Sequence, residues 1–368
     1  YYLAREHSIQ NVAVLEQGYI GGGNTGRNTT IVRSNYLTPE GVKFYDASLK
    51  LFQDLSTELD INLFYSTRGH YTLAHSDDAM RTMRWRAEVN KHHGVESEVV
   101  DREAIAEAIP GIDLDCGGSQ AIEGALYHAP GAVARHDAVA WGYGRAAAAR
   151  GVELHQKTRV TGIQQSGGRV QGVSTDRGTI RCDAVVSMVA GSTPRITDMV
   201  GLPTPIEVFP LQACVTEPVK PFLDTIVVSG SLHVYVSQSS RGELVMGAAV
   251  DPTVLHSTRS TFEFVEGLAD SMVDLLPFTA RMRVNRQWAG MSDMTPDFAP
   301  IMGTTPLEGF YLDAGWGTWG FKATPISGKT MAATVANGRN HELIEPFRYG
   351  RFADFEMVGE KGAASVGH

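Results

Sequence analysis

Two cationic residues stand beside segments rich in small residues. Arg33 ends the run IGGGNTGRNTTIVR, whose glycines and short polar residues let backbone amides approach a phosphate or a flat ring. Lys322 follows the turn GWGTWGF, where Trp316 and Trp319 are able to exclude water. A guanidinium fork binds a carboxylate, and a lysine beside glycines holds a carboxylate or a negatively charged flavin edge. Together the two cations would select an amino acid; the ordinary alternatives are a surface loop and a solvated lysine that caps a turn.

A single histidine, His136, lies in the stretch AVARHDAVAWGYG among small, apolar and aromatic residues. At helical spacing it falls on an apolar stripe, so the ring is expected on or near a packed face. A buried imidazole without a partner is costly. The residues therefore leave two readings open: a satisfied core histidine, or a ligand or catalytic histidine. The stripe consists of Val139, Ala140, Tyr143 and Ala147.

Composition excludes several classes of function. The 368 residues carry a net charge of −9 without a run of Lys or Arg, which disfavours nucleic-acid binding and favours a small-molecule ligand. The three cysteines form no CxxC pair and suit a reducing compartment. No metal cluster is expected. No apolar run reaches the roughly 18 residues of a membrane helix, and no signal-peptide pattern is present, so the prediction is a cytoplasmic protein.

The segment NVAVLEQG predicts a short strand that ends in a carboxylate, Glu16. In dinucleotide-binding folds an acid at this position binds the adenosine ribose, while a GxGxxG turn holds the pyrophosphate. The acid is present and the glycine turn is absent. Because YYLAREH reads as the last turns of a helix, we expect that an N-terminal piece carrying this turn is missing. The alternative is a buried strand that ends in a solvated glutamate.

The remaining pattern supplies elements that would position these residues. Helices are expected over 41–58, 78–93 and 258–276, and strands alternate with turns over 206–249. Gly167 and Gly168 predict the turn of a three-stranded meander, and DAVVSMVAGS a buried strand that ends in small residues. The last strand should pass through the GWGTWG turn into a helix that begins at about Pro325, whose N-terminal amides favour an anion.

Several blocks of sequence resemble one known family. The segments VAVLEQG, GGN-x-x-RNTTI-x-RSNY, HVYVSQ-x-x-x-GELVMGA and GWGT-x-GFK-x-TP look like the β subunits of heterotetrameric sarcosine oxidases, within the superfamily of flavin-dependent amino acid oxidases. The run WAG-x-x-x-x-TPD-x-x-P-x-x-G, residues 288–303, and Glu16 are signs of the superfamily. The likeness spans nearly the whole chain.

The resemblance implies an α/β fold with a doubly wound FAD-binding domain and a mixed β-sheet substrate domain. The FAD-binding domain is expected to be discontinuous, over 1–61, 130–200 and 287–345. The substrate domain would take 62–129 and 201–286, and 346–368 would form a C-terminal tail.

The resemblance also implies the reaction and its cofactors. A noncovalent FAD would oxidise sarcosine to glycine, with formaldehyde or 5,10-methylenetetrahydrofolate as the other product. An FMN attached covalently to His136 would pass the electrons to oxygen and yield hydrogen peroxide. The partners implied are α, γ and δ subunits, with NAD and tetrahydrofolate expected on the α subunit.

The resemblance also implies roles for individual residues of this sequence. Arg33 and Lys322 would bind the substrate carboxylate or tune the FAD, and Tyr235 would face the substrate or be an ordinary aromatic core residue. Arg135, His136, His233 and Arg286 would lie at the FMN, although His233 and Arg286 would equally suit ordinary strand positions. The expected FAD contacts are Glu16, Asn24, Arg27, Thr29, Ile31, Val160, Gly315, Gly317, Gly320 and Lys322.

Two other functions compete with this interpretation. One is another FAD-dependent amino acid oxidase or dehydrogenase that acts on proline, glycine, dimethylglycine or a D-amino acid. The other is a noncatalytic cofactor-binding or assembly subunit, favoured by the absence of the glycine turn.

Overall fold

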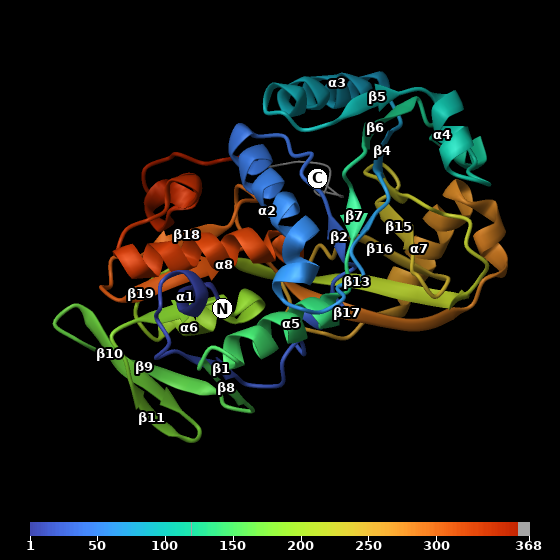
Figure 1. Cartoon of the computed structure of the whole chain (residues 1–368). Coiled ribbons are helices and arrows are strands. Elements are labelled where there is room, and N and C mark those ends of the chain that lie inside the picture. The colour runs from blue at the N-terminus through green and yellow to red at the C-terminus, as the bar shows by residue number, and fades with distance from the viewer. Residues whose placement is uncertain (119, 360–368) are drawn as a thin grey trace.

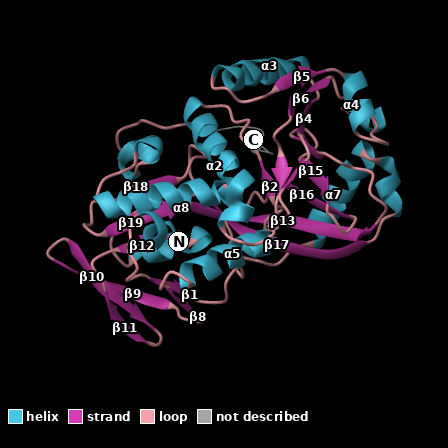
Figure 2. Cartoon of the chain, viewed as in Figure 1, coloured by secondary structure: helices cyan, strands magenta, loops and turns pink. Residues whose placement is uncertain are grey.

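A computed structural model describes residues 1–118 and 120–359 (Figure 1). Residues 360–368 of the expected C-terminal tail lie outside the described part. Helices and strands intermix along the chain, with one long sheet on one side and shorter parallel strands on the other (Figure 2). No helix within the described ranges has the length and apolar character needed to cross a membrane.

Eight of the described strands form the long sheet, in the order β17-β13-β16-β15-β14-β4-β6-β5. Neighbouring strands pair antiparallel except β14 and β4, which run parallel. The predicted alternation of strands over 206–249 is confirmed. The strands are β17 (Val284–Met294), β13 (Glu207–Pro218), β16 (Glu243–Val250), β15 (Val234–Gln238), β14 (Ile226–Ser229), β4 (His70–Ala74), β6 (Gly124–His128) and β5 (Glu98–Val100).

The two faces of this sheet differ because side chains alternate along each strand. One face carries Tyr71, Val227 and Met246, which pack in an apolar core with helices α4 (Arg102–Ala108) and α7 (Phe262–Leu275). The opposite face, called the site face below, carries a row of residues in register across the sheet. That row is Trp288, Ala213, Gly247, Tyr235, Val228, Thr72 and Leu126.

The parallel part of the fold appears as two short sheets. β1 (Ala13–Glu16) pairs parallel with β8 (Glu153–Gln156). β12 (Val185–Ser187) pairs parallel with β19 (Phe310–Ala314), which pairs antiparallel with β18 (Ile301–Thr304). The predicted meander is confirmed as an antiparallel sheet, which projects from the body in Figure 1. Its strands are β9 (Val160–Ser166), β10 (Arg169–Thr175) and β11 (Gly178–Arg181).

Helices begin where the sequence supplies capping groups. Thr38 caps α2 (Pro39–Glu58) by accepting from the Gly41 amide at 3.1 Å, and Ser76 caps α3 (Asp77–His92) in the same way. The helix expected over 258–276 is shorter, because Thr261 caps it at Phe262. The remaining helices are α1 (Tyr2–Glu6), α5 (His136–Ala148), α6 (Thr193–Asp198) and α8 (Gly320–Asn337).

The start of α8 corrects the prediction. The helix begins at Gly320 and not at about Pro325, which lies inside it. A proline in a helix leaves the carbonyl four residues earlier without its amide partner. Here the Thr324 hydroxyl donates to the Phe321 carbonyl at 2.8 Å, so the freed carbonyl is paired and the helix continues. As a result Lys322 lies in the first turn of the helix.

Short segments complete the fold. β2 (Ile31–Val32) and β3 (Ser66–Thr67) both pair with β7 (Ala132–Val133) in a small antiparallel sheet. Helix α2 packs along α8 (Figure 1). The 3₁₀ helices are Asn24–Arg27, Cys116–Gly118, Ala190–Ser192, Pro277–Arg281, Glu342–Phe347 and Tyr349–Phe352.

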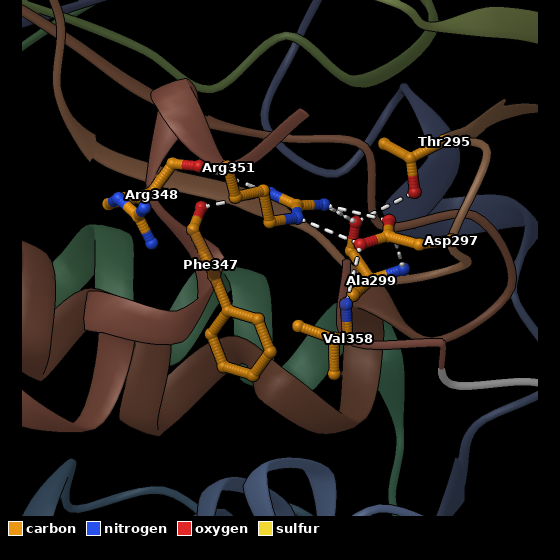
Figure 3. A network of polar contacts seen from close by, with 7 residues as sticks. All are labelled: Thr295, Asp297, Ala299, Phe347, Arg348, Arg351 and Val358. Carbon is orange, nitrogen blue, oxygen red and sulfur yellow. Dashed lines mark hydrogen bonds and ion pairs between the residues drawn. The ribbon is translucent and has the colours of Figure 1, made fainter. Parts of the chain in front are cut away.

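A buried ion pair joins the TPD motif to the C-terminal segment (Figure 3). Asp297 and Arg351 are 1% and 0% exposed, and each carboxylate oxygen accepts from the guanidinium at 2.8 Å. The same carboxylate accepts from the Val358 amide at 3.1 Å, and Arg351 also donates to the Ala299 carbonyl. Burial alone would raise the pKa of Asp297, but the hydrogen bonds and charge of Arg351 outweigh it and hold that pKa below its usual range.

Breaking this pair should destabilise the protein strongly. Arg351→Met leaves the Asp297 charge buried and unpaired, and we expect the free energy of unfolding to fall by about 3–5 kcal/mol. Urea denaturation followed by tryptophan fluorescence measures the change. Arg348→Met is the matched control, because Arg348 pairs with the exposed Asp354 and Glu356. This substitution should lower the free energy of unfolding by at most about 1 kcal/mol. Equal effects of the two substitutions would contradict the assignment.

Candidate functional site

The segment 24–36 lies across the site face of the long sheet and is called the crossing segment below. At its start the Asn24 side chain donates to the Met291 carbonyl at 2.6 Å and accepts from the Met291 amide at 3.0 Å. The Trp288 indole N–H donates to the Arg27 carbonyl at 2.6 Å. The Asn24 side chain thus donates to and accepts from the backbone of one residue of β17, as the backbone of a neighbouring strand would. The described contacts of the Asn24 and Arg27 side chains are to the protein's own backbone, and the assignment of both residues to FAD stays a prediction.

The crossing segment next meets β15 and β14. Thr29 is hydrogen-bonded to the Tyr235 hydroxyl, and burial raises the pKa of Tyr235 to about 12. Ile31 packs with Tyr235 and Val228 in one apolar cluster. Gly247 lies in register with Tyr235, and a Cβ there would approach the Tyr235 hydroxyl to 2.0 Å. The tyrosine therefore lies flat over a glycine on the site face, between the sheet and the crossing segment.

The end of the crossing segment, the RSNY block, is buried against β6 and α3. The Ser34 amide donates to Nε2 of His128 at 3.2 Å. The Asn35 carbonyl accepts from Arg86 Nε at 2.7 Å, and the Tyr36 carbonyl accepts from the Asn90 amide group at 2.8 Å. Successive backbone groups of the block are thus paired with side chains, which fixes the path of the chain next to Arg33.

His128 is a neutral residue with one defined tautomer. Because Nε2 accepts the Ser34 amide proton, the hydrogen must reside on Nδ1, which donates to the Glu96 carbonyl at 2.7 Å. Burial, helped by the charges of Arg33 and Arg86 and opposed by the Glu96 contact, lowers the pKa of His128 to about 4. The imidazole therefore serves as a hydrogen-bond acceptor toward the crossing segment.

The structure brings Arg33 and Lys322 together. They are 3% and 7% exposed, and burial together with the Arg33 charge lowers the pKa of Lys322 well below its usual value. The Lys322 carbonyl accepts from the Ser48 hydroxyl at 2.6 Å, which ties this end of α8 to α2. No ion pair within the described ranges involves Arg33 or Lys322. A buried cationic site without a carboxylate of its own fits an anionic ligand.

A second histidine stands beside these cations. His70 on β4 is 1% exposed, and its pKa is lowered well below the usual value by burial and by the charge of Arg33. Nδ1 of His70 lies 3.5 Å from the Thr72 hydroxyl. Sequence reasoning missed His70, His128 and Arg86, because each comes from an element far along the chain from Arg33.

The glycine turn before α8 is held by two buried carboxylates. Gly315 and Gly317 have φ of 73° and 53°, a conformation that favours glycine. Asp293 accepts from the Gly315 amide at 2.7 Å, and Asp313 accepts from the Trp316 indole at 2.7 Å. A Cβ on Gly315 would lie 2.6 Å from Thr295, so the turn closes against the TPD motif. The one signal for Asp313 in the sequence was an acid within the apolar strand FYLDA.

Asp293 should make stability depend on pH. Burial, partly offset by the amide contacts, raises its pKa from 3.8 to about 7. A raised pKa means that the folded state holds the proton more tightly. The contribution of this group is therefore full below pH 3.8 and is lost as the pH rises to about 7. Asp293→Asn keeps an oxygen for the Gly315 amide and removes the titration.

We expect the unfolding midpoint of Asp293→Asn, relative to the unmodified protein, to rise across that pH interval. Thermal denaturation at a series of pH values measures the difference. Asp270→Asn, on the exposed face of α7, is the control and should give a parallel curve. A parallel curve for Asp293→Asn as well would show that the carboxyl is ionised throughout.

The expected adenosine end of the site lies at the end of β1. Glu16 accepts from the Gly18 amide at 2.6 Å, and the Gly18 carbonyl accepts from the Lys157 amide at 2.9 Å. Val160 begins β9 two residues after Thr158, whose amide donates to the Glu16 carbonyl. Glu16 and Val160 thus lie on adjoining backbone, so residues far apart in the sequence meet here.

His136 is the first residue of α5, which confirms the predicted helix. Nδ1 of His136 is buried and has no hydrogen-bond partner among the described residues. Burial, with a contribution from Arg135 and against that of Asp137, lowers the pKa of His136. Arg135 is half-exposed, forms an ion pair with Asp137 and lies over the Phe64 ring at 5.4 Å. A buried imidazole nitrogen without a partner fits covalent attachment of a flavin at that atom.

His233 and Arg286 lie at separate places on the sheet. His233 is exposed in a turn before β15, with φ of 54°, and not within the strand. Arg286 on β17 is exposed and in register with Val215, which is in register with Val245 and so with Ser237. Ser237 lies on β15, four residues after His233 in the sequence. The structure therefore does not bring these two side chains together.

Comparison with known proteins places the chain in a family. The model of the family "FAD dependent oxidoreductase" (DAO) matches residues 1–334. The chain is 41% identical to the sarcosine oxidase subunit beta of Rhodobacter capsulatus, covering 100% of this chain and 88% of that protein. It is 43% identical to the sarcosine oxidase subunit beta of an Arthrobacter species, covering 100% of this chain and 91% of that protein.

Solved structures share the fold. L-proline dehydrogenase from P. horikoshii superposes with a TM-score of 0.89 at 24% identity, over 97% of this chain and 95% of that one. Glycine oxidase from Geobacillus kaustophilus gives 0.83 at 21% identity, over 92% of each chain. These likenesses confirm the predicted α/β fold of the flavin-dependent amino acid oxidases. The chain belongs to the family of FAD-dependent oxidoreductases and, within it, to the β subunits of sarcosine oxidase.

Proposed function

We propose that this subunit oxidises sarcosine to glycine within a heterotetramer with α, γ and δ subunits in the cytoplasm. Formaldehyde or 5,10-methylenetetrahydrofolate and hydrogen peroxide are the other products, and NAD and tetrahydrofolate bind the α subunit. The observation that carries the proposal is the pair Arg33 and Lys322, a buried guanidinium and a buried amine that have no carboxylate partner within the described ranges. A small amino acid supplies the carboxylate that this site lacks.

The unpartnered Nδ1 of His136 supports a covalently held FMN, and the other flavin positions are part of the proposal. FAD is held noncovalently at Glu16, Thr29, Ile31, Val160, the turn of Gly315, Gly317 and Gly320, and Lys322. FMN would be held covalently by His136, with Arg135, His233 and Arg286 as further candidates to contact it. When bound, FAD supplies the acceptor for a hydride from the N-methyl group, and FMN supplies the site from which electrons reach oxygen.

The substrate is bound through its carboxylate and deprotonated at its amine. Arg33 binds the carboxylate with its guanidinium fork. Because burial lowers the pKa of Lys322, its amine is neutral before the substrate binds, and the substrate carboxylate then raises that pKa. The ammonium group of sarcosine then gives a proton to Nζ of Lys322, which leaves the neutral amine that hydride loss requires. Tyr235 and the buried Trp319 close the site against water.

Anaerobic reduction by sarcosine tests the activity. We expect sarcosine to reduce the flavin of the enzyme purified with its partner subunits, at lower concentration than proline, glycine or dimethylglycine. Lys322→Met should raise the sarcosine concentration for half-maximal reduction about tenfold or more, since a charge-assisted hydrogen bond is lost. Lys329→Met is the control on the same helix, because Lys329 pairs with Glu6 near the surface. If sarcosine does not reduce the bound flavin, the chain is a noncatalytic subunit.

The attachment of FMN has its own test. After acid precipitation of the enzyme coexpressed with its partners, we expect the pellet to stay yellow and the peptide containing His136 to carry the mass of one FMN. His136→Asn should release all flavin on precipitation while the fold persists. If the unmodified protein also loses all its flavin, His136 is a packed core residue and a single-flavin dehydrogenase becomes the better interpretation.

A further inference from the structure

One buried polar group in the cationic site lacks a partner. Asn35 is 0% exposed, and its Nδ2 has no hydrogen-bond partner in the part of the chain that the structure describes. Leaving a buried amide N–H unpaired is unfavourable, because the group loses its hydrogen bonds to water and gains none in the protein. Such a group therefore points to a missing acceptor.

The orientation of the Asn35 amide follows from its neighbour. Arg33 Nη1 donates to Oδ1 of Asn35 at 2.9 Å and to the Asn35 carbonyl at 3.1 Å. Because a guanidinium has donors only, it must face the oxygen of the amide, so Nδ2 is directed to the other side. The side chain is thus fixed as an acceptor toward Arg33 and a donor elsewhere.

The backbone of Asn35 is held as firmly as its side chain. Its carbonyl accepts from Arg86 as well as from Arg33, and the flanking amide of Ser34 and carbonyl of Tyr36 are paired with His128 and Asn90. Asn35 therefore has little freedom to turn its amide toward a different partner. An acceptor must come to it.

The charges around the site indicate the kind of acceptor. Arg33 contacts Asn35 directly, and Lys322 lies within electrostatic reach of Arg33. Nearby His70 and His128 are neutral at ordinary pH because their pKa values are lowered. An acceptor in these surroundings gains most if it is anionic, and a carboxylate offers separate oxygens for a guanidinium and an amide.

We propose that Asn35 is a substrate-binding residue whose Nδ2 donates a hydrogen bond to the carboxylate of the bound amino acid, beside Arg33. This inference rests on the proposed function and extends it, since it adds a neutral donor to the cations of the site. The amide helps to distinguish a carboxylate from an uncharged group of the same shape.

The substitution Asn35→Asp tests the proposal. It keeps the shape and the oxygen that accepts from Arg33, but it replaces the donor by a second acceptor that repels a carboxylate. We expect the KM for sarcosine and the Kd for acetate each to rise about tenfold or more, with a smaller change in kcat per flavin. Acetate binding is measured by calorimetry on the holoenzyme purified with its partner subunits.

A comparison of acetate with acetamide gives a readout that does not depend on turnover. Acetamide has the same shape without the charge, so Asn35→Asp should lower the preference for acetate over acetamide about tenfold or more. Because the preference is a ratio, partial loss of folded protein leaves it unchanged. Asn35→Ser adds no charge and has too short a side chain to reach both partners, so it should weaken acetate binding as well.

Asn11→Asp is the matched control. Asn11 is exposed in the segment before β1, so this substitution makes the same change of charge at the surface. Unchanged acetate binding in both Asn35 variants, with normal folding and flavin content, would overturn the proposal. If the unmodified enzyme is not reduced by sarcosine, the proposed function fails, and acetate binding still decides whether Asn35 contacts a carboxylate.

Discussion

The structure depends on one constraint: the crossing segment runs across the strands of the long sheet, and its end, residues 32–36, is buried there. Only Ile31 and Val32 of the segment pair in a ladder, with β7, and burial makes unpaired amides and carbonyls elsewhere costly. Side chains supply the partners instead. Asn24 bonds with β17, Trp288 with the Arg27 carbonyl, His128 with the Ser34 amide and Asn90 with the Tyr36 carbonyl.

Polar groups on the site face supply some of these partners, as the His128 imidazole and the Trp288 indole do. His70 and Thr72 alternate with Tyr71 and Leu73 on one strand, so the same strand serves an apolar core on one side and a polar site on the other. The polar side chains fix the crossing segment, and the segment in turn fixes Arg33. The hydrogen bonds that hold the crossing segment therefore also position Arg33 for its proposed ligand.

The glycine turn before α8 is built on a different principle. Its glycines adopt left-handed conformations, and its amides and the Trp316 indole are held by the buried carboxyls of Asp293 and Asp313. The adjacent TPD motif uses its own carboxylate to anchor Arg351. Carboxyl groups thus hold the protein's backbone on one side, while Arg33 and Lys322 are left for a ligand on the other.

The sequence alone determined the features that depend on local pattern. Alternation and turn residues predicted the meander and the strands over 206–249, and helical spacing predicted α2 and α5. The residue types at Arg33 and Lys322 pointed to an anion or flavin site, whereas the flavin at His136 was implied by the family resemblance. Tertiary structure decided the partners. Asn24 and Met291 are 267 positions apart, and His128 and Ser34 are 94 apart, so no local spacing predicts either pair. The start of α8 was missed because a threonine hydroxyl compensates for Pro325, and Asn35 was missed because an unpaired amide is visible only once every neighbour is in place.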